Sequence, residues 1–123
     1  MVEFSFAHNC LKVLDLERSL KFYKEALGLA PVRWMRPSDA DIQLVFLSDG
    51  YSAHELELGC PADRERPFDL GDNEFHVAFR TADMEGAHAL HESMGCIAYD
   101  PETEPVYFIH DPDGYLIEII PAD

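Results

Sequence analysis

Apolar and polar residues alternate with a period of two in several short stretches and recur with a helical period in two longer ones. The first pattern is typical of strands with one buried face, and the second is typical of amphipathic helices. Each half of the chain opens with a strand-like stretch, at residues 4–13 and 74–80. The pattern therefore predicts short strands combined with two helices in one mixed fold.

A helix is predicted after each opening strand. Asp15 and Asp83 suit helix N-caps, because a carboxylate there accepts hydrogen bonds from the first unpaired backbone N–H groups. Gly28 and Gly95 suit the left-handed residue that ends a helix. Three short strand candidates follow each helix, at residues 31–36, 42–48 and 53–59, and then at 96–100, 105–110 and 115–120. The order of elements is βαβββ, twice, which is an α+β fold.

The two halves also repeat one another at particular residues. His8 and His76 each stand four residues before a base and seven residues before the Asp that precedes the helix. Each half then contains Asp-Gly-Tyr, at 49–51 and 113–115, followed by a glutamate between aliphatic residues. Such ordered matches indicate a duplicated module.

The duplication predicts a single domain over residues 1–123. We expect its first module at residues 1–60, a linker at 61–72 and its second module at 73–123. A module of about 50 residues buries too little apolar surface to be stable alone. The two modules must therefore pack together or against another chain.

The chain carries a formal net charge of -15, from 24 acidic and 9 basic residues. The second half is the more acidic, because residues 68–123 hold 13 acids and only one base. Nucleic acids and anionic membrane surfaces attract clustered cations, so we expect neither as a partner. Three cysteines without C-x-x-C spacing, together with no apolar run that suits a signal peptide or membrane span, predict a cytoplasmic protein.

Two histidines and two glutamates are the main candidates for chemistry. His8 and Glu57 lie on the first and last strands of the first module, and His76 and Glu118 hold the same places in the second. A glutamate inside an apolar strand is rarely buried unless it is paired, hydrogen-bonded or bound to metal. If the modules pack about a pseudo-twofold axis, two imidazoles and two carboxylates converge, a set that suits zinc, nickel, cobalt, iron or manganese. Glu55 shares a strand face with Glu57 and is the alternative ligand, although only Glu57 has the aliphatic setting of Glu118.

Several stretches resemble the vicinal oxygen chelate superfamily, and glyoxalase I (lactoylglutathione lyase) within it. They are His8-x-x-Leu-x-Val-x-Asp15, Phe22-Tyr23-x-x-x-Leu27-Gly28, Glu55-Leu-Glu57-Leu, Phe75-His76-Val-Ala-Phe79 and Asp111-Pro-Asp-Gly114-Tyr-x-Ile-Glu118. The resemblance spans nearly the whole chain and implies the fold of that family, built from two βαβββ modules. It also implies one divalent nickel, cobalt or zinc ion per site, with four ligands: His8, Glu57, His76 and Glu118.

Resemblance to glyoxalase I implies conversion of a methylglyoxal–thiol hemithioacetal to an S-lactoyl thioester through an enediolate. Glu118 is then the base and Glu57 its counterpart. Other members of the superfamily leave three alternatives: an epimerase, a dioxygenase, or a non-catalytic small-ligand-binding dimer of the bleomycin-resistance kind. Glyoxalases of this length are homodimers with metal sites at the subunit interface, which implies a homodimer here unless one chain closes its own site.

Lys12 and Arg80 follow the two histidines on the same strand faces and are candidates for binding an anionic substrate. In glyoxalase I the position of Lys12 is commonly an arginine that contacts glutathione. Cys60 and Pro61 stand where relatives often carry a glutathione-binding asparagine, and the segment 100–104 is acidic. These departures predict weak activity with glutathione and better activity with another thiol or another oxygen-chelating substrate.

The remaining polar and aromatic candidates are interpreted as structural. His88 and His91 are three residues apart, and we expect them on the solvent-exposed face of the second helix. Trp34 and Met35 are expected in the core. The cysteines are expected to be small core residues: Cys10, Cys60 and Cys96.

Overall fold

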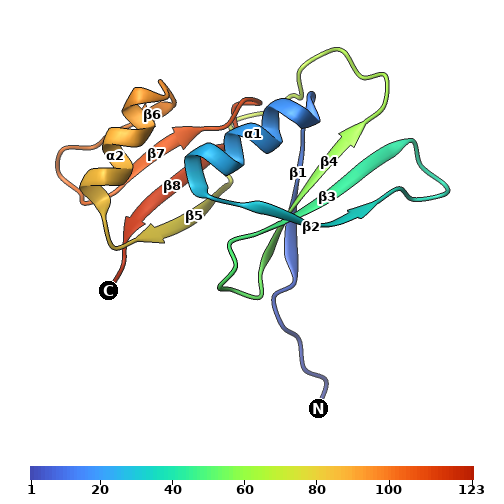
Figure 1. Cartoon of the computed structure of the whole chain (residues 1–123), viewed down its shortest axis with the longest axis horizontal. Helices are drawn as coiled ribbons and strands as arrows, with labels where there is room; N and C mark the ends of the chain where they lie inside the picture. Colours follow the sequence, from blue (N-terminus) through green and yellow to red (C-terminus); the bar gives the residue numbers. More distant parts are fainter. The chain divides into compact units, whose positions relative to one another are not determined.

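The computed structural model describes residues 1–123, which form two compact units, residues 1–68 and residues 69–123 (Figure 1). Each unit contains one helix and one four-stranded sheet in the order βαβββ. The α+β fold predicted from the sequence pattern is therefore confirmed. Neither helix is long and apolar enough to cross a membrane.

In the first unit the opening strand pairs in parallel with the last strand of the unit, and the other pairs are antiparallel. The sheet order is β1-β4-β3-β2, so β1 and β2 are the edge strands. The elements are β1 (His8–Lys12), α1 (Leu16–Leu27), β2 (Ala30–Met35), β3 (Ile42–Ser48) and β4 (Glu55–Pro61).

The second unit repeats this topology with the sheet order β5-β8-β7-β6. Its elements are β5 (His76–Thr81), α2 (Met84–Ser93), β6 (Ile97–Tyr99), β7 (Tyr107–His110) and β8 (Leu116–Pro121). The register is repeated as well, because Cys10 is opposite Glu57 in the first sheet and Ala78 is opposite Glu118 in the second. The duplication in the sequence is thus also a duplication of strand pairing.

Both helices begin where the sequence predicts. The side chain of Asp15 accepts a hydrogen bond from the backbone N–H of Arg18, and that of Asp83 accepts one from Gly86. Gly28 caps the end of α1 with φ of 70°. Gly95 follows the last residue of the α2 cap and also has a positive φ, of 69°. Such a conformation favours glycine, because a side chain there would be strained.

Alternation along the strands separates a buried face from a second face in each sheet. The buried apolar residues of the first unit include these from β1, β3 and β4: Leu11, Val45, Leu47, Leu56 and Leu58. The residues between them on β1 and β4, among them His8, Cys10 and Glu57, therefore point to the opposite face. The hydrophobic core and the candidate chemistry lie on opposite sides of the same strands.

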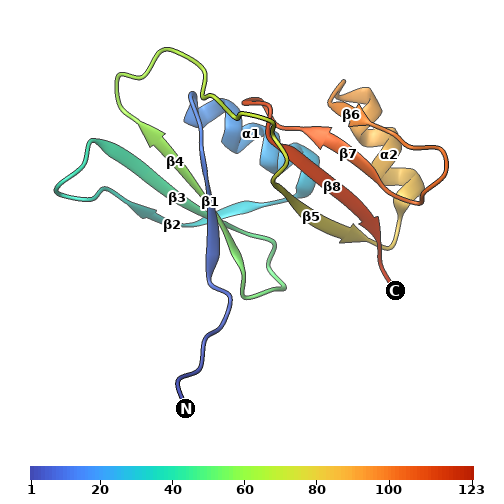
Figure 2. The ribbon, with the colours of Figure 1, turned by 180° about the vertical axis from the view of Figure 1, so that it is seen from behind.

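The first strand is shorter than the sequence pattern predicts. It begins at His8, and Phe4 and Phe6 before it are 93% and 91% exposed. The neighbouring strand β4 begins at Glu55, whose backbone N–H donates to the carbonyl of Ala7, so residues 4–6 have no adjacent strand to continue the ladder. Figure 2 shows this opening segment extending away from the sheet of the first unit.

The prediction that Trp34, Met35 and the cysteines lie in the core is also wrong. Trp34 and Met35 are about half-exposed, because β2 is an edge strand whose residues are all exposed. Cys10 is exposed on the face opposite the core, and Cys60 and Cys96 are only partly buried. All three thiols are free.

His91 is not on the solvent-exposed face of its helix, contrary to the prediction from its spacing. It is 1% exposed, and its Nδ1 lies 2.7 Å from the hydroxyl oxygen of Tyr107 on β7. His88, one turn earlier, is partly exposed and contacts Asp100 through Nε2 at 2.6 Å. The spacing of the two histidines could not show that β7 supplies a buried phenol to one of them.

Tyr107 gives a prediction for alkaline stability. The pKa of this phenol is raised to about 12, mainly because the side chain is buried and to a smaller extent because of the charges of the nearby Cys96 and Asp100. An unfolded chain loses the phenol proton near pH 10, so the free energy of unfolding should fall between about pH 10 and about pH 12. Tyr107→Phe should remove this dependence and cost about 1 kcal/mol at neutral pH, from the hydrogen bond with His91.

Chemical denaturation as a function of pH measures both effects. Tyr99→Phe is the matched control, because Tyr99 is 62% exposed. A Tyr107→Phe protein that loses stability above about pH 10 as steeply as the wild type would contradict the assignment.

Candidate metal centre

The first unit brings one histidine and one glutamate together on the face opposite its core. His8 Nε2 lies 3.4 Å from Glu57 Oε1, although the two residues are far apart in sequence. The parallel pairing of β1 with β4 places them diagonally across adjacent strands. The ring of Phe46, on β3 opposite Glu57, packs against the imidazole of His8 with centroids 5.3 Å apart.

The second unit repeats this group of three side chains. His76 Nε2 lies 3.4 Å from Glu118 Oε1. Phe108, opposite Glu118 on β7, contacts His76 with ring centroids 5.2 Å apart. We call each set a half-site: the first consists of His8, Glu57 and Phe46, and the second consists of His76, Glu118 and Phe108.

The spacing within each pair suits two ligands of one metal ion. A hydrogen bond between imidazolium and carboxylate is about 2.7–2.9 Å long. Two ligand atoms that each lie about 2.0–2.2 Å from an ion at a tetrahedral angle are roughly 3.4 Å apart. Both half-sites have this longer spacing, and both offer an imidazole nitrogen and a carboxylate oxygen. The residues therefore fit a divalent metal ion.

The two candidate glutamates of β4 have different partners. Glu55 Oε1 accepts a hydrogen bond from Arg33 Nη2 at 3.0 Å, whereas Glu57 faces His8. Glu57 is 8% exposed, and a buried carboxylate requires a compensating partner. These contacts favour Glu57 over Glu55 as the ligand.

Lys12 and Cys10 lie beside the first half-site. Lys12 Nζ donates to Cys10 Sγ at 3.3 Å. The ammonium group therefore folds back along β1 towards Cys10, the residue that is opposite Glu57 on β4. Burial raises the pKa of the Cys10 thiol, and the ammonium of Lys12 opposes that shift. The stem of Lys12 passes close to Gly59, where an added Cβ would lie 3.1 Å from Lys12 Cδ. Arg80 is exposed at the corresponding place on β5.

Neither unit completes a metal site by itself. No third His, Cys, Asp or Glu joins either pair in a metal-binding group. His88 has carboxylates on both ring nitrogens, Asp100 at Nε2 and Glu92 at Nδ1, and groups on opposite sides of one ring cannot share an ion with it. Each unit therefore offers two candidate ligands, and a four-ligand centre would require two half-sites.

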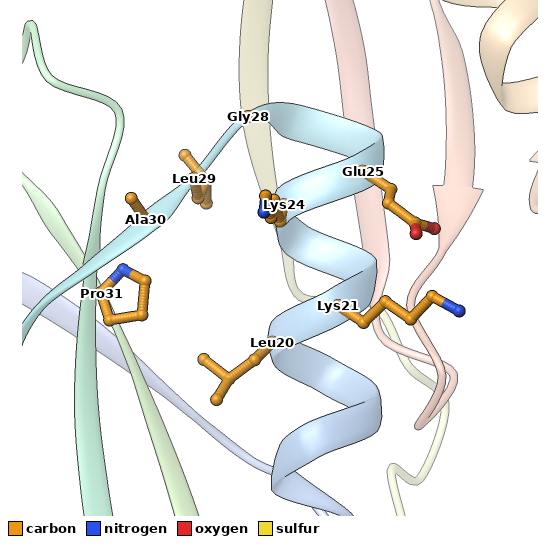
Figure 3. A pocket seen from close by; sticks show the side chains of 8 residues that line it. All are labelled: Leu20, Lys21, Lys24, Glu25, Gly28, Leu29, Ala30 and Pro31. Atoms are coloured by element: carbon orange, nitrogen blue, oxygen red, sulfur yellow. The ribbon is translucent and has the colours of Figure 1, made fainter.

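A cavity of about 780 Å³ lies elsewhere in the first unit, between the end of α1 and the start of β2 (Figure 3). Leu20 points towards Pro31, whereas Lys21 and Glu25 extend to the other side of the helix. No residue of the first half-site lines this cavity. It is therefore separate from the candidate metal centre.

The sequence pattern did not identify Phe46, Phe108 or Arg33 as neighbours of the candidate ligands. Their positions depend on which residues are opposite one another across three strands, and one sequence does not give the register of a sheet. The sequence did contain one signal for the two phenylalanines. Each lies in the strand that precedes the strand with the glutamate, so an alignment of the two halves of the chain could have matched Phe46 with Phe108.

Fold and half-sites together define a duplicated α+β protein with two equivalent His–Glu pairs. The sequence profile described as the glyoxalase/bleomycin resistance protein/dioxygenase superfamily matches residues 7–108. The chain belongs to this superfamily.

Its relatives include enzymes of one kind. The lactoylglutathione lyase of Haemophilus influenzae is 32% identical over 121 residues, which cover 92% of this chain and 89% of that protein. A probable lactoylglutathione lyase of Synechocystis is 28% identical over 123 residues and covers 92% of both chains. The trypanothione-dependent glyoxalase I of Leishmania major has a TM-score of 0.84 at 29% identity, over 97% of this chain and 87% of its own. The chain is thus a lactoylglutathione lyase-like enzyme, and these relatives imply a divalent metal cofactor.

Metal titration tests the half-sites directly. Removal of one ligand, in His8→Ala, should weaken Ni²⁺ or Zn²⁺ binding by more than about 100-fold, because even the loss of a group that only hydrogen-bonds to a ligand often costs about 10–100-fold. Isothermal calorimetry on the metal-free protein gives both the affinity and the number of ions bound per chain. His54→Ala is the control, since His54 contacts Asn9 and lies outside both half-sites. Equal affinity in wild type and His8→Ala would exclude His8 as a ligand.

Proposed function

We propose that this enzyme is a metal-dependent lyase of the glyoxalase I type, which converts a methylglyoxal–thiol hemithioacetal to an S-lactoyl thioester. The observation that carries the proposal is the pair of equivalent half-sites, each with a histidine and a glutamate 3.4 Å apart. Two imidazoles and two carboxylates from two half-sites supply the donor set for Ni²⁺, Co²⁺ or Zn²⁺. The free cysteines are compatible with action in a reducing cytoplasm.

The difficult step of the reaction is the removal of a proton from carbon next to a carbonyl group. A bound divalent ion would supply Lewis-acid stabilisation of the negative charge that develops on the substrate oxygens. Glu118 acts as the base: its carboxylate takes the proton from one carbon and returns it to the adjacent carbon. His8 and His76 serve as ligands.

The surroundings of the two glutamates support this division of roles. The Glu118 side chain is 23% exposed and is opposite Ala78, a small residue that leaves the carboxylate room to move. The Glu57 side chain is 11% exposed and is opposite Cys10. The more accessible carboxylate is better placed to reach a substrate, and the more confined one is better placed to remain a ligand.

Lys12 and Arg80 provide positive charge that can hold a carboxylate of an anionic substrate. They lie on the strand faces of the half-sites in a chain whose net charge is -15. Lysine presents a point charge and not the bidentate fork of arginine, so Lys12 should hold a carboxylate less specifically than an arginine would. This supports a preference for a thiol other than glutathione.

The base assignment predicts a large and specific kinetic effect. Glu118→Gln should lower kcat by roughly 100- to 10,000-fold, because an amide cannot accept the proton. The amide oxygen can still bind the ion, so metal content should fall much less than kcat. Steady-state kinetics with methylglyoxal and a panel of thiols, alongside metal analysis, separates these quantities. Glu102→Gln, an exposed change outside the half-sites, is the control, and equal kcat in the two variants would overturn the assignment.

The second part of the proposal is a homodimer with two shared sites, each built from the first half-site of one chain and the second half-site of its partner. Mixed dimers test this without a structure. His8→Ala and Glu118→Ala should each be inactive, but a dimer of one with the other keeps one site with all four ligands. Random exchange of subunits should therefore restore about one quarter of wild-type activity.

The matched control mixes His8→Ala with Glu57→Ala. Both changes damage the same half-site, so every shared site in such a dimer lacks a ligand. Recovery with the first pair and none with the second supports shared sites. Failure of both mixtures to recover, after mass spectrometry has verified mixed dimers, would show that each chain closes its own site.

A further inference from the structure

Two nucleophilic side chains lie in contact on β1, beside the first half-site. Lys12 Nζ donates to Cys10 Sγ at a distance of 3.3 Å. The two residues are two positions apart on one strand, so their side chains share the face that also carries His8. Both side chains are exposed, and Cys10 forms no disulfide. A thiol and an amine are therefore in contact at a place that small molecules can reach.

A glycine on the neighbouring strand sets the direction of the Lys12 side chain. Gly59 of β4 is opposite Lys12, and a Cβ added to Gly59 would lie 3.1 Å from Cδ and 3.4 Å from Cε of Lys12. The aliphatic stem of Lys12 therefore lies across the space that a larger residue at position 59 would fill. Packing of the stem on β4 directs the terminal nitrogen along β1 to Cys10.

The second half-site has no such pair. The residues of β5 that correspond to Cys10 and Lys12 are Ala78 and Arg80. A methyl group is not a nucleophile, and a guanidinium stays protonated and does not take up acyl groups at physiological pH. The duplicated framework thus carries a thiol beside an amine in its first half only.

A thiol in contact with an amine is the arrangement that transfers an acyl group from sulfur to nitrogen. Cysteine forms covalent acyl intermediates because sulfur is a strong nucleophile. Burial raises the pKa of the Cys10 thiol and so lowers its thiolate fraction, which makes acylation of the sulfur slow. The following transfer to Lys12 is intramolecular, and groups that are held in contact react as if they were present at very high concentration. An acyl group that reaches Cys10 is therefore passed on to Lys12.

We propose that Cys10 and Lys12 form an acyl-acceptor site, in which a thioester gives its acyl group first to the sulfur of Cys10 and then to the nitrogen of Lys12. The source of the acyl group rests on the proposed function, because a reaction of the glyoxalase I type makes a thioester at the centre beside this pair. The site adds a covalent modification to that function: the thioester product converts Lys12 to an amide.

Both steps balance without an oxidant or a cofactor. In the first step a bond forms between Cys10 Sγ and the acyl carbon, the C–S bond of the thioester breaks, and the released thiol takes up the proton that Cys10 lost. In the second step the ammonium of Lys12 gives one proton to solvent, and Nζ attacks the acyl carbon. The bond from Sγ to the acyl carbon then breaks, and a second proton passes from nitrogen to sulfur. One thioester and one ammonium group thus give one thiol, one amide and one proton.

The modification leaves a measurable mark on the chain. Acylation removes the positive charge of Lys12, and trypsin does not cleave after an acylated lysine. Digestion of the modified protein should therefore yield residues 1–18 in place of residues 1–12. Lys21 and Lys24, the other two lysines of the chain, lie on α1 and report background acylation in the same sample.

The test exposes the full-length protein to a small neutral thioester, S-acetyl-N-acetylcysteamine, which requires no metal centre. Mass spectrometry of tryptic peptides measures the acetyl amide on each lysine, and hydroxylamine at neutral pH removes thioesters but leaves amides. Wild-type protein should carry at least about 10-fold more amide on Lys12 than on Lys21 or Lys24, because only Lys12 receives the group from a neighbouring sulfur. Cys10→Ala should lower the acetylation of Lys12 to the level of the other two lysines.

Two further variants separate transfer from direct acylation of the amine. Lys12→Arg keeps the positive charge but does not take the group from sulfur, so a hydroxylamine-sensitive thioester should accumulate on Cys10. Cys60→Ala is the matched control, because Cys60 Sγ contacts the backbone carbonyl of Leu14, and Lys12 should be acetylated as in the wild type. Equal acetylation of Lys12 in wild type and Cys10→Ala would overturn the proposed transfer. A wild-type protein that keeps the thioester on Cys10, or that is modified at neither residue, would overturn it as well.

A second reagent separates this site from the proposed function. S-lactoyl-N-acetylcysteamine carries the acyl group that the proposed reaction forms, and turnover of methylglyoxal with a panel of thiols is measured separately on the metal-loaded enzyme. Transfer from both reagents, by an enzyme that forms no S-lactoyl thioester with any thiol, would overturn the proposed function and leave the acyl-acceptor site in place. Turnover without transfer from the lactoyl reagent to Lys12 would overturn the acyl-acceptor site as a target of the product and leave the metal centre in place. Turnover together with transfer to Lys12 supports both.

Discussion

The parallel pairing of the first and last strands of each unit is the constraint on which the candidate centre depends. His8 and Glu57 are 49 positions apart in the chain numbering, and only the β1–β4 register brings their side chains within 3.4 Å. The same pairing of β5 with β8 joins His76 to Glu118. A shift of one residue in either ladder would turn the ligand set to the other face of its sheet. Helix α1 and strands β2 and β3 connect β1 to β4 along the chain, as α2, β6 and β7 connect β5 to β8.

One face of each sheet carries the apolar core, and the other face carries the histidine and the glutamate. This division explains how the protein tolerates carboxylates in its central strands. The aliphatic neighbours of Glu57 fill the core, while Glu57 itself meets an imidazole. Alternate residues of one strand therefore serve the core and the candidate centre, so a residue on one face can be substituted without replacing a residue on the other. The acidic composition raises the cost of bringing such carboxylates together, because like charges repel. A divalent cation bound at the proposed centre would offset that cost.

Duplication produces two half-sites with the same ligand types, and the edge strands then make them unequal. The bulges in β2 and β6 place Arg33 beside one half-site and Tyr99 beside the other. The duplicated framework thus repeats the His–Glu pair, and the edge strands differ in the residue that lies beside each pair.

The sequence alone determined the α+β fold, the caps at Asp15 and Asp83, and the repeated His–Glu pairs, because these depend on local periodicity and on self-similarity within the chain. The predictions from the sequence were wrong for the start of β1, the exposure of Trp34 and the burial of His91. Each of these depends on whether another strand or helix lies alongside, which no local pattern records. The contact of Glu55 with Arg33, and hence the distinction between Glu55 and Glu57, likewise needed the register across β2, β3 and β4. Residue types were decided by the sequence, and their partners by tertiary structure, since partners are set by strand register and packing between segments distant in the chain.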